Sequence, residues 1–359
     1  MYREFMLAAL KQAWLGRGIC APNPSVGSVA VHNNQIIARA WHQGAGNAHA
    51  EQSVIQQLPA ALKNITLYVT LEPCNHWGRT PPCVAAIINS NVKRVVFGFR
   101  DPNPVVAAND TPYILREQGI EVEHFPLPEI DEFYQSYYYW TNTKRPWVTA
   151  KLAQTLDGKI AGLQGKQIQL SNEKCKEFTH YQRLYTDVIL TTARTVINDN
   201  PALDVRLPAI SQQKPIAIVD TNLSLAKAVT ELKIFQTAKH CHIYHDEKIK
   251  VEELRANCTY HAMPAVQGQL DLNAVITHLG ELGYHDIWVE AGGKFFSALH
   301  QQSLVQKTYL YLVPSFLEKE ATQAYHGDNF FNKPHKVSWI EQEDNMIACL
   351  TWGELCLPV

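Results

Sequence analysis

The sequence predicts an α/β protein of two domains, and three observations support this prediction. The chain has 359 residues, more than one ordinary domain holds. Hydrophobic residues make up 46% of it and charged residues 18%, enough apolar side chains to fill two cores. Strand-like runs alternate with helical stretches along the whole length, as in layered α/β folds.

The first domain is expected to span residues 1–145. Strands are expected at 26–31, 35–41, 65–70 and 92–99, and helices at 4–15, 49–58, 84–89 and 130–143. Together they predict a mixed sheet covered by helices. The dipeptide before Pro146 follows the last of these helices, so the boundary is placed near residues 143–146.

The second domain, residues 146–359, repeats the alternation. Strands are expected at 147–153, 187–191, 215–220, 240–244, 286–291 and 308–313, and a helix at 272–282. Two final strands, at 346–351 and 355–357, are expected to close the sheet in antiparallel fashion.

Composition argues against several classes of protein. A formal net charge of −2 is unlike the basic surface of a nucleic-acid binder. No apolar run of about 18 residues is present, so no membrane span is expected. The first residues have the pattern of an amphipathic helix and not of a signal peptide. Eight cysteines, scattered along the chain, favour reduced thiols and a cytoplasmic location.

A histidine, a glutamate and two cysteines form the clearest motif. His49 and Glu51 open a predicted helix, Cys74 follows a proline, and Cys83 comes eight intervening residues later. Zinc prefers thiolate and imidazole ligands, and three protein ligands leave a fourth position for water. Glu51 is suited to carry a proton beside the metal without binding it. The motif predicts one Zn²⁺ per chain and a hydrolytic deaminase.

A structural zinc site is the alternative, with His76 as a fourth ligand. Structural sites usually use closely spaced ligand pairs, and Cys74 with His76 would be a cramped pair. Glu51 would also have no role. The other six cysteines show no paired spacing and are expected to be buried, inert thiols.

Longer motifs resemble a known family over nearly the whole chain. They are PCNHWGRTPPC at 73–83, DPNP at 101–104, KLAQTLDGKIA at 151–161, TVINDNPAL at 195–203 with Arg206, and VEAGG at 289–293. These resemble the bifunctional riboflavin-biosynthesis deaminase–reductases. The family pattern usually has Ser at Asn75 and Thr155, Ser at Gln167 and Trp at Gln169, so these four positions depart from it.

The resemblance implies two folds and two reactions. A cytidine-deaminase-like α/β/α layer domain would remove the 2-amino group of a diaminopyrimidinone that carries a phosphoribosylamino group. A dihydrofolate-reductase-like α/β domain would bind NADPH and reduce the ribosyl group to ribityl by hydride delivery at C1′.

The resemblance also implies residues that contact the ligands. In the deaminase the substrate would be bound by Asn23, His42, His76, Arg79 and Asn103. An amide is suited to a pyrimidine edge, and His42 and Arg79 to a phosphate.

In the reductase, the residues implied for the substrate are Lys151, Gln167, Arg183, Leu203, Arg206 and Glu290, and those implied for NADPH are Ala153, Gln169, Ser171, Thr195, Asp199, Gly292, Gly293 and Lys294. An unpaired ammonium at Lys151, in an apolar strand, would be costly without a partner. Glycines at the start of a helix can hold a phosphate on backbone amides. Hydride transfer needs no protein nucleophile, so no catalytic base is assigned there.

Three other functions stay open at this point: a deaminase of another nucleobase with a non-reducing second domain, a tRNA-binding editing module, and a non-catalytic zinc-stabilised protein. The expected partner is a phosphorylated small-molecule pyrimidine, without nucleic acid or membrane. The sequence leaves the oligomeric state open, a homo-oligomer included.

Overall fold

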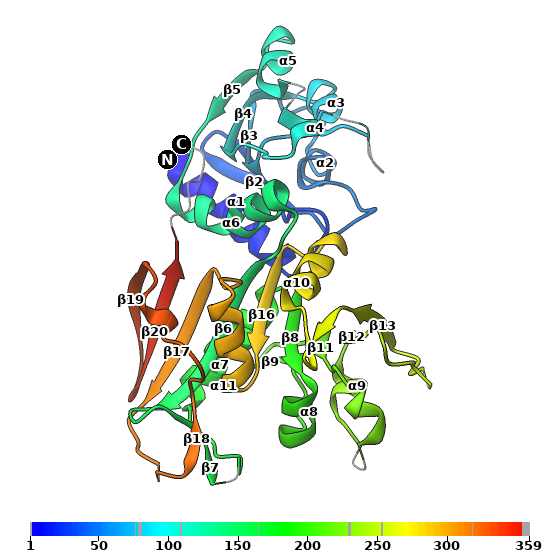
Figure 1. Cartoon of the computed structure of the whole chain (residues 1–359). Coiled ribbons are helices and arrows are strands. Elements are labelled where there is room, and N and C mark those ends of the chain that lie inside the picture. The colour runs from blue at the N-terminus through cyan, green and yellow to red at the C-terminus, as the bar shows by residue number, and fades with distance from the viewer. Residues whose placement is uncertain are drawn as a thin grey trace. The chain divides into compact units, whose positions relative to one another are not determined.

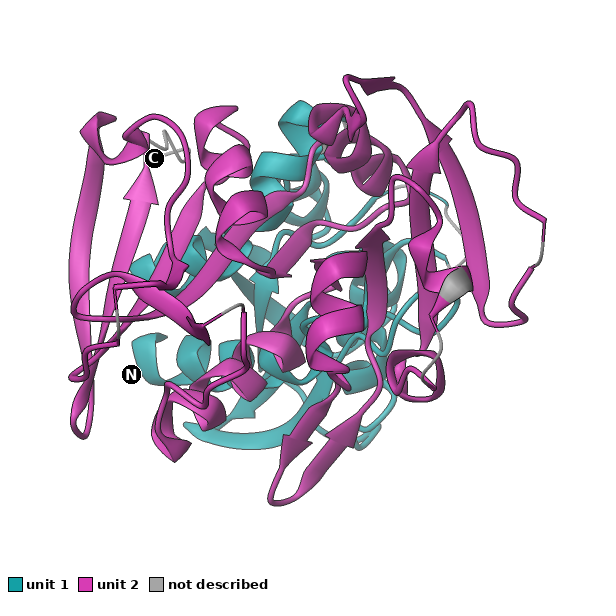
Figure 2. Cartoon of the chain, turned by 60° about the horizontal axis from the view of Figure 1, so that its bottom comes forward, with its two compact units in different colours: residues 1–144, 357–359 teal, residues 145–356 magenta. Residues whose placement is uncertain are grey.

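The computed structural model of the chain describes residues 2–75, 77, 81–107, 110–163, 165–228, 231–252, 254–317 and 319–353. It divides into two compact units, of which the first ends its main segment at Lys144 and the second begins at Arg145 (Figure 2). Among the described residues, no helix combines the length and the apolar content that crossing a membrane requires.

The first unit is built on a five-stranded sheet. Its strands are β1 (Gly27–His32), β2 (Gln35–Trp41), β3 (Ile65–Leu71), β4 (Val92–Phe99) and β5 (Glu121–His124), in the order β2-β1-β3-β4-β5. Strand β1 is antiparallel to both of its neighbours, whereas β3, β4 and β5 are parallel. The predicted mixed sheet is confirmed, and β5 is an additional edge strand.

Helices cover both faces of this sheet (Figure 1). They are α1 (Tyr2–Gly16), α2 (Ala50–Ile55), α3 (Cys83–Ile88), α4 (Pro104–Ala107), α5 (Thr111–Glu117) and α6 (Pro128–Thr143). Helices α1 and α6 share one face, where the ring centroids of Trp14 and Phe133 lie 4.9 Å apart. Helices α2 and α3 contact each other on the other face. The result is the expected α/β/α layer arrangement.

The second unit has a nine-stranded sheet. Its strands are β6 (Trp147–Thr155), β8 (Val188–Thr192), β11 (Pro215–Val219), β12 (His240–Asp246), β13 (Cys258–Met263), β16 (Asp286–Glu290), β17 (Lys307–Val313), β19 (His335–Gln342) and β20 (Asn345–Trp352). The order is β13-β12-β11-β8-β16-β6-β17-β20-β19. The strands from β13 to β17 in this order are parallel, and β20 and β19 continue the sheet antiparallel.

The antiparallel closure predicted from residues 346–351 is confirmed as β20, which pairs with β17 and β19. The strand expected at 355–357 lies outside the described residues.

Two hydrophobic cores lie on the two faces of the large sheet. Helices α10 (Leu272–Glu281) and α11 (Gly293–Gln301) contribute to one core, and α7 (Glu173–Tyr185) and α8 (Ala193–Asp199) to the other. Shorter elements complete the unit: α9 (Ile234–Thr237), two 3-10 turns at Ser224–Lys227 and Phe330–Asn332, and the strands β7 (Lys159–Leu163), β9 (Val205–Leu207), β10 (Ile210–Gln212), β14 (Ala265–Val266), β15 (Gln269–Leu270) and β18 (Ala321–Gln323).

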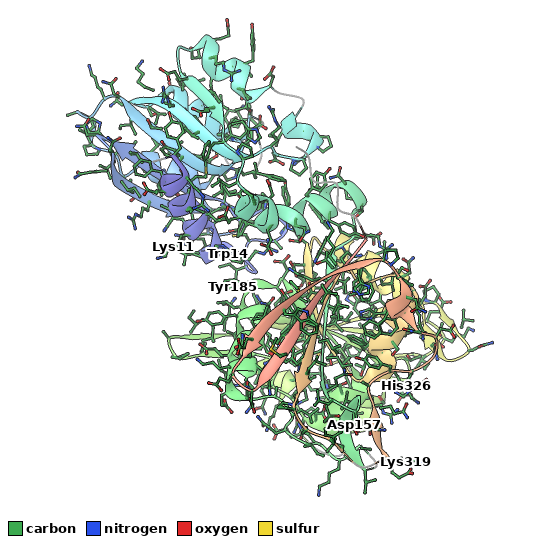
Figure 3. All side chains as sticks on the ribbon, turned by 90° about the vertical axis from the view of Figure 1, so that its left-hand side faces the viewer. Lys11, Trp14, Asp157, Tyr185, Lys319 and His326 are labelled. Carbon is green, nitrogen blue, oxygen red and sulfur yellow. The ribbon has the colours of Figure 1, made fainter. Side chains whose placement is uncertain are left out.

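A loop after β6 is fastened to the segment that precedes β18. The Asp157 carboxylate accepts a hydrogen bond from the Leu317 amide at 3.3 Å, and Lys159 Nζ donates to the Lys319 carbonyl at 3.1 Å. Figure 3 shows Asp157 and Lys319 near each other on the second unit. Strand β18 then pairs with β7, so this loop and this segment are held together at several points.

Candidate active sites

Three elements of the first unit bring His49, Cys74 and Cys83 together. His49 lies directly before α2, Cys74 follows β3 in a loop, and Cys83 is the first residue of α3. Their ligand atoms lie within 4.8 Å of one another. His49 Nδ1 is 3.1 Å from Cys83 Sγ and 3.4 Å from Cys74 Sγ. Tetrahedral zinc with usual bond lengths separates such atoms by about 3.5 Å, so this donor set fits the metal.

Electrostatics favour a thiolate in this cluster. A hydrogen bond with Cys83 lowers the pKa of Cys74 to about 4, and burial raises the pKa of Cys83. A hydrogen bond with Cys74 raises the pKa of His49. Because thiolate is the form that binds a metal, the cluster is chemically prepared for one.

Glu51 lies beside the metal ligands in the first turn of α2. Glu51 is only 3% exposed, and burial raises the pKa of its carboxyl group to about 6. The carboxyl group also interacts with the Cys83 thiol. A carboxyl group that ionises close to neutral pH is suited to proton transfer.

Asn23 and His42 form a second polar pair in the first unit. Asn23 Nδ2 lies 3.0 Å from His42 Nε2, and His42 Nδ1 lies 3.2 Å from the Ala48 carbonyl. If Nδ1 donates to that carbonyl, Nε2 accepts from the amide, which describes a neutral ring. Burial lowers the pKa of His42, in agreement. The phosphate contact that the resemblance implied for His42 stays a prediction, and the pair orients the Asn23 amide.

Asn103 lies in a turn that contains Asp101, a residue of the DPNP motif to which the sequence analysis assigned no role. The Asp101 side chain accepts hydrogen bonds from the Asn103 amide at 2.9 Å and from the Tyr137 hydroxyl at 3.0 Å. Burial raises the pKa of Asp101 to about 7. Asp101 and Tyr137 are 36 residues apart in the chain, so no short sequence motif predicts their contact. His76 and Arg79 lie outside the described residues.

The second unit gathers an ammonium, a carboxylate and a guanidinium on neighbouring central strands and α7. Lys151 of β6 and Glu290 of β16 are paired in register. Arg183 Nε and Nη2 donate to the two Glu290 oxygens at 2.6 and 2.9 Å. Burial alone would raise the pKa of Glu290, but the Arg183 guanidinium lowers it to about 2. Glu290 is therefore a permanent carboxylate at neutral pH.

Lys151 is half-buried, and its ammonium has few polar contacts. Within the described part of the chain, its Nζ lies 5.0 Å from the centroid of the Tyr311 ring and donates no hydrogen bond. Burial lowers its pKa. Three unused donors beside a carboxylate indicate a site that a polar ligand completes.

The remaining residues expected at the reductase site are spread around this centre. Arg206 is exposed and forms an ion pair with Asp204, whose carbonyl accepts a 2.9 Å hydrogen bond from Arg183 Nη1. Leu203 is buried, with a φ of 49°. Ala153 and Thr195 are half-buried; Gln167, Gln169 and Asp199 are exposed, and Gln169 Nε2 donates to the Ser171 carbonyl at 3.2 Å. Among the described residues, no hydrogen bond or ion pair joins these side chains to Lys151.

The predicted helix start at Gly292 and Gly293 is confirmed as the start of α11. The two glycines differ in their surroundings. A Cβ on Gly293 would lie 2.2 Å from the Ala324 carbonyl oxygen, whereas a Cβ on Gly292 would meet nothing within 4 Å. Gly293 is therefore required by packing, and Gly292 and exposed Lys294 leave room for a ligand.

Two family descriptions match the chain. Residues 146–343 match the RibD C-terminal domain, and residues 1–99 match the cytidine and deoxycytidylate deaminase zinc-binding region. The Escherichia coli riboflavin biosynthesis protein RibD is 33% identical over 331 residues, which cover 88% of this chain and 89% of that protein.

The chain belongs to the RibD family. RibD of Actinobacillus pleuropneumoniae is 34% identical over 322 residues, 88% of this chain and 84% of that protein. The solved deaminase/reductase from Thermotoga maritima superposes with a TM-score of 0.86 at 28% identity, covering 98% of this chain and 99% of that one. RibD of Acinetobacter baumannii gives a TM-score of 0.83 at 26% identity with the same coverage.

Membership in the RibD family makes this chain a bifunctional enzyme of riboflavin biosynthesis, with a zinc deaminase and a reductase activity. Zn²⁺ and NADPH are its cofactors. A tRNA-binding editing module and a non-catalytic zinc protein find no support in these matches.

Proposed function

We propose that residues 1–145 perform the deamination and residues 146–359 the reduction, with the site roles that follow. His49, Cys74 and Cys83 hold the zinc ion. The observation that carries this assignment is the convergence of two thiols and an imidazole within 4.8 Å, with Glu51 alongside. When bound, zinc lowers the pKa of a water towards ~7 and so supplies hydroxide at neutral pH.

Glu51 moves the protons of the deamination. Its carboxylate accepts the first proton of the attacking water and delivers it to the ring nitrogen. It then carries the second proton, from the newly formed hydroxyl group, to the amino group, which leaves as ammonia. Burial at 3% exposure keeps bulk water away from this carboxyl group, so the proton stays within the site. A group whose pKa lies near neutrality can both accept and release a proton.

Asn23 reads the pyrimidine edge, and His42 keeps the Asn23 amide in one orientation through the 3.0 Å contact. Asn103, His76 and Arg79 complete the substrate contacts, with Arg79 at the phosphate. A planar guanidinium matches a phosphate with two parallel hydrogen bonds.

The deaminase assignment is tested with Glu51→Gln. The variant should retain its zinc, measured by mass spectrometry of metals, and lose ammonia release by ~10²–10⁴-fold. Glu117→Gln is the matched control because Glu117 is an exposed residue of α5 in the same unit. Ammonia release by Glu51→Gln at the rate of the control would refute the proton-transfer role.

In the reductase, Lys151 and Glu290 bind the sugar part of the substrate, with Arg183 and Arg206 nearest to its phosphate. Arg183 donates three N–H groups to Glu290 and Asp204, which leaves it few donors for a phosphate. Exposed Arg206 therefore makes most of the hydrogen bonds to the phosphate. Gln167 and Leu203 are assigned to the same ligand.

NADPH is assigned to the start of α11 and to the strand ends around it. NADPH supplies the hydride. Gly292, Gly293 and Lys294 receive its phosphates on backbone amides and a side-chain ammonium. Ala153, Gln169, Ser171, Thr195 and Asp199 are assigned to the rest of the cofactor.

A product mass spectrum tests both domains together. The purified chain is given the diaminopyrimidine substrate, made in situ from GTP, with and without NADPH. The deaminated mass is expected without NADPH and the reduced mass with it. If the reaction stops at the deaminated product although NADPH is present, the reductase assignment is refuted. That result would also refute the expectation that the reductase works with Gln169 in place of the family's tryptophan.

The substrate is proposed to be a free phosphorylated pyrimidine and not a nucleic acid, because a net charge of −2 is unlike the strongly basic character of a nucleic-acid binder. A reducing, cytoplasmic compartment is proposed from the scattered cysteines. Salt-sensitive RNA binding in a filter assay would contradict the first of these statements.

A further inference from the structure

We propose that Trp288 is a positioning residue of the reductase site, which holds the Glu290 carboxylate in its ligand-binding orientation. This inference rests on the role proposed for Glu290. Trp288 lies two residues before Glu290 on β16, so both side chains project from the same face of the sheet. Its indole is 1% exposed, with the ring centroid 5.9 Å from that of Tyr309.

The indole N–H of Trp288 donates its hydrogen bond to the Glu290 carboxylate. A buried indole N–H requires an acceptor, and Trp288 Nε1 donates to Glu290 Oε1 at 2.8 Å. Hydrophobic packing alone would be satisfied by phenylalanine. The choice of an indole with its N–H on a site carboxylate therefore indicates a role beyond filling volume.

Counting donors shows what this contact does to Glu290. A carboxylate offers about four acceptor positions on its two oxygens. Oε1 accepts from Arg183 Nε at 2.6 Å and from Trp288 Nε1, while among the described residues Oε2 accepts only from Arg183 Nη2 at 2.9 Å. Oε1 is therefore filled, and one acceptor position is left at Oε2.

A complementary donor lies on the neighbouring strand. Lys151, paired in register with Glu290, has an ammonium that makes no hydrogen bond within the described chain. A sugar hydroxyl both donates and accepts, so it can donate to Oε2 and accept from Lys151. Without the Trp288 contact, Oε1 would lose one of its two donors and the Arg183 fork alone would hold the carboxylate, so the open acceptor would be less firmly directed.

The test is Trp288→Phe, which retains an aromatic ring and removes only the N–H and part of the indole. The expected result is a rise of ~10-fold in KM for the deaminated substrate, the effect of one hydrogen bond to a charged group, with kcat within about threefold. A purely structural role would reduce the fraction of active protein, so kcat would fall at unchanged KM. That outcome would overturn the proposal.

Trp352→Phe is the matched control. Trp352 Nε1 donates to Thr308 Oγ1 at 2.8 Å in the same unit, and neither residue is assigned to the site. This variant loses the same N–H and should leave KM unchanged. An equal rise of KM in both variants would overturn the proposal, because the effect would then be general to the fold.

Glu290→Gln separates failure of this inference from failure of the proposed function. If Trp288 acts through Glu290, Trp288→Phe added to Glu290→Gln should raise KM no further. If Glu290→Gln alone leaves KM unchanged, the role proposed for Glu290 is wrong. If Glu290→Gln raises KM and Trp288→Phe does not, the positioning role alone is refuted.

Discussion

Substitution of Gly293 by alanine probes the start of α11 most sharply. The new Cβ would lie 2.2 Å from the Ala324 carbonyl oxygen and 2.8 Å from its carbon, whereas real Cβ atoms stay beyond 3.0 Å. Both obstacles are backbone atoms, so no side-chain rotation relieves the overlap. The helix or the segment around Ala324, which is fully buried, must move by most of an ångström.

Overpacking of this kind costs ~1–3 kcal/mol. For a unit of this size, each kcal/mol lowers the melting temperature by roughly 2–4 °C, so a loss of roughly 2–12 °C is expected. Gly292→Ala is the control: its Cβ would meet nothing within 4 Å, and its φ of −70° suits any residue. Its stability should change by less than about 1 kcal/mol, the scale of an N-cap change.

Calorimetry of the full chain measures both variants, and the transition that NADPH raises identifies the reductase unit. Gly292→Ala should keep its melting temperature and lose affinity for NADPH, whereas Gly293→Ala should lose stability even without cofactor. Unchanged stability of Gly293→Ala would refute the packing argument.

Two further outcomes are expected. Burial lowers the pKa of His242 to about 3 and of His300 to about 4, from an ordinary value of 6.5. Below pH 6.5 these histidines are protonated in the unfolded chain while they stay neutral in the folded one. The free energy of unfolding is therefore highest above pH 6.5, and it falls towards pH 4 by up to ~1.4 kcal/mol per pH unit for each histidine. Denaturant titrations from pH 8 to 4.5 check this, and a flat profile would contradict it. Removal of zinc by a chelator should lower the melting temperature of the first unit and abolish ammonia release. The melting temperature of the unit that NADPH stabilises should not change. An equal fall of both melting temperatures would contradict the independence of the two units.

Much of the fold was predictable because its strands are buried and apolar. Strands β2 and β4 begin and end at the predicted residues. Helix α7 was missed for a physical reason: the residues that it buries are Cys175, Thr179 and Arg183, which give no apolar periodicity. Edge strand β19 was missed because its residues are mostly exposed and it forms no buried apolar run.

The metal site was predictable because its candidate ligands form short sequence motifs, and the structure brings His49, Cys74 and Cys83 together. The roles of Asp101, Tyr137 and Trp288 were not, since each depends on which partner the fold brings near. Side-chain pairing of this kind is settled by tertiary structure and leaves no short-range signal.

The order of strands in the large sheet has a consequence for biosynthesis. Strand β16 lies between β8 and β6, yet it follows both of them in the chain, after β11, β12 and β13. A ribosome therefore releases both neighbours long before the strand that joins them. Until β16 emerges, the interior edges of β6 and β8 remain unpaired, and such edges invite association with other chains. Closure of the sheet is therefore expected to be a late and slow event, and the stage at which the nascent enzyme most needs protection from aggregation.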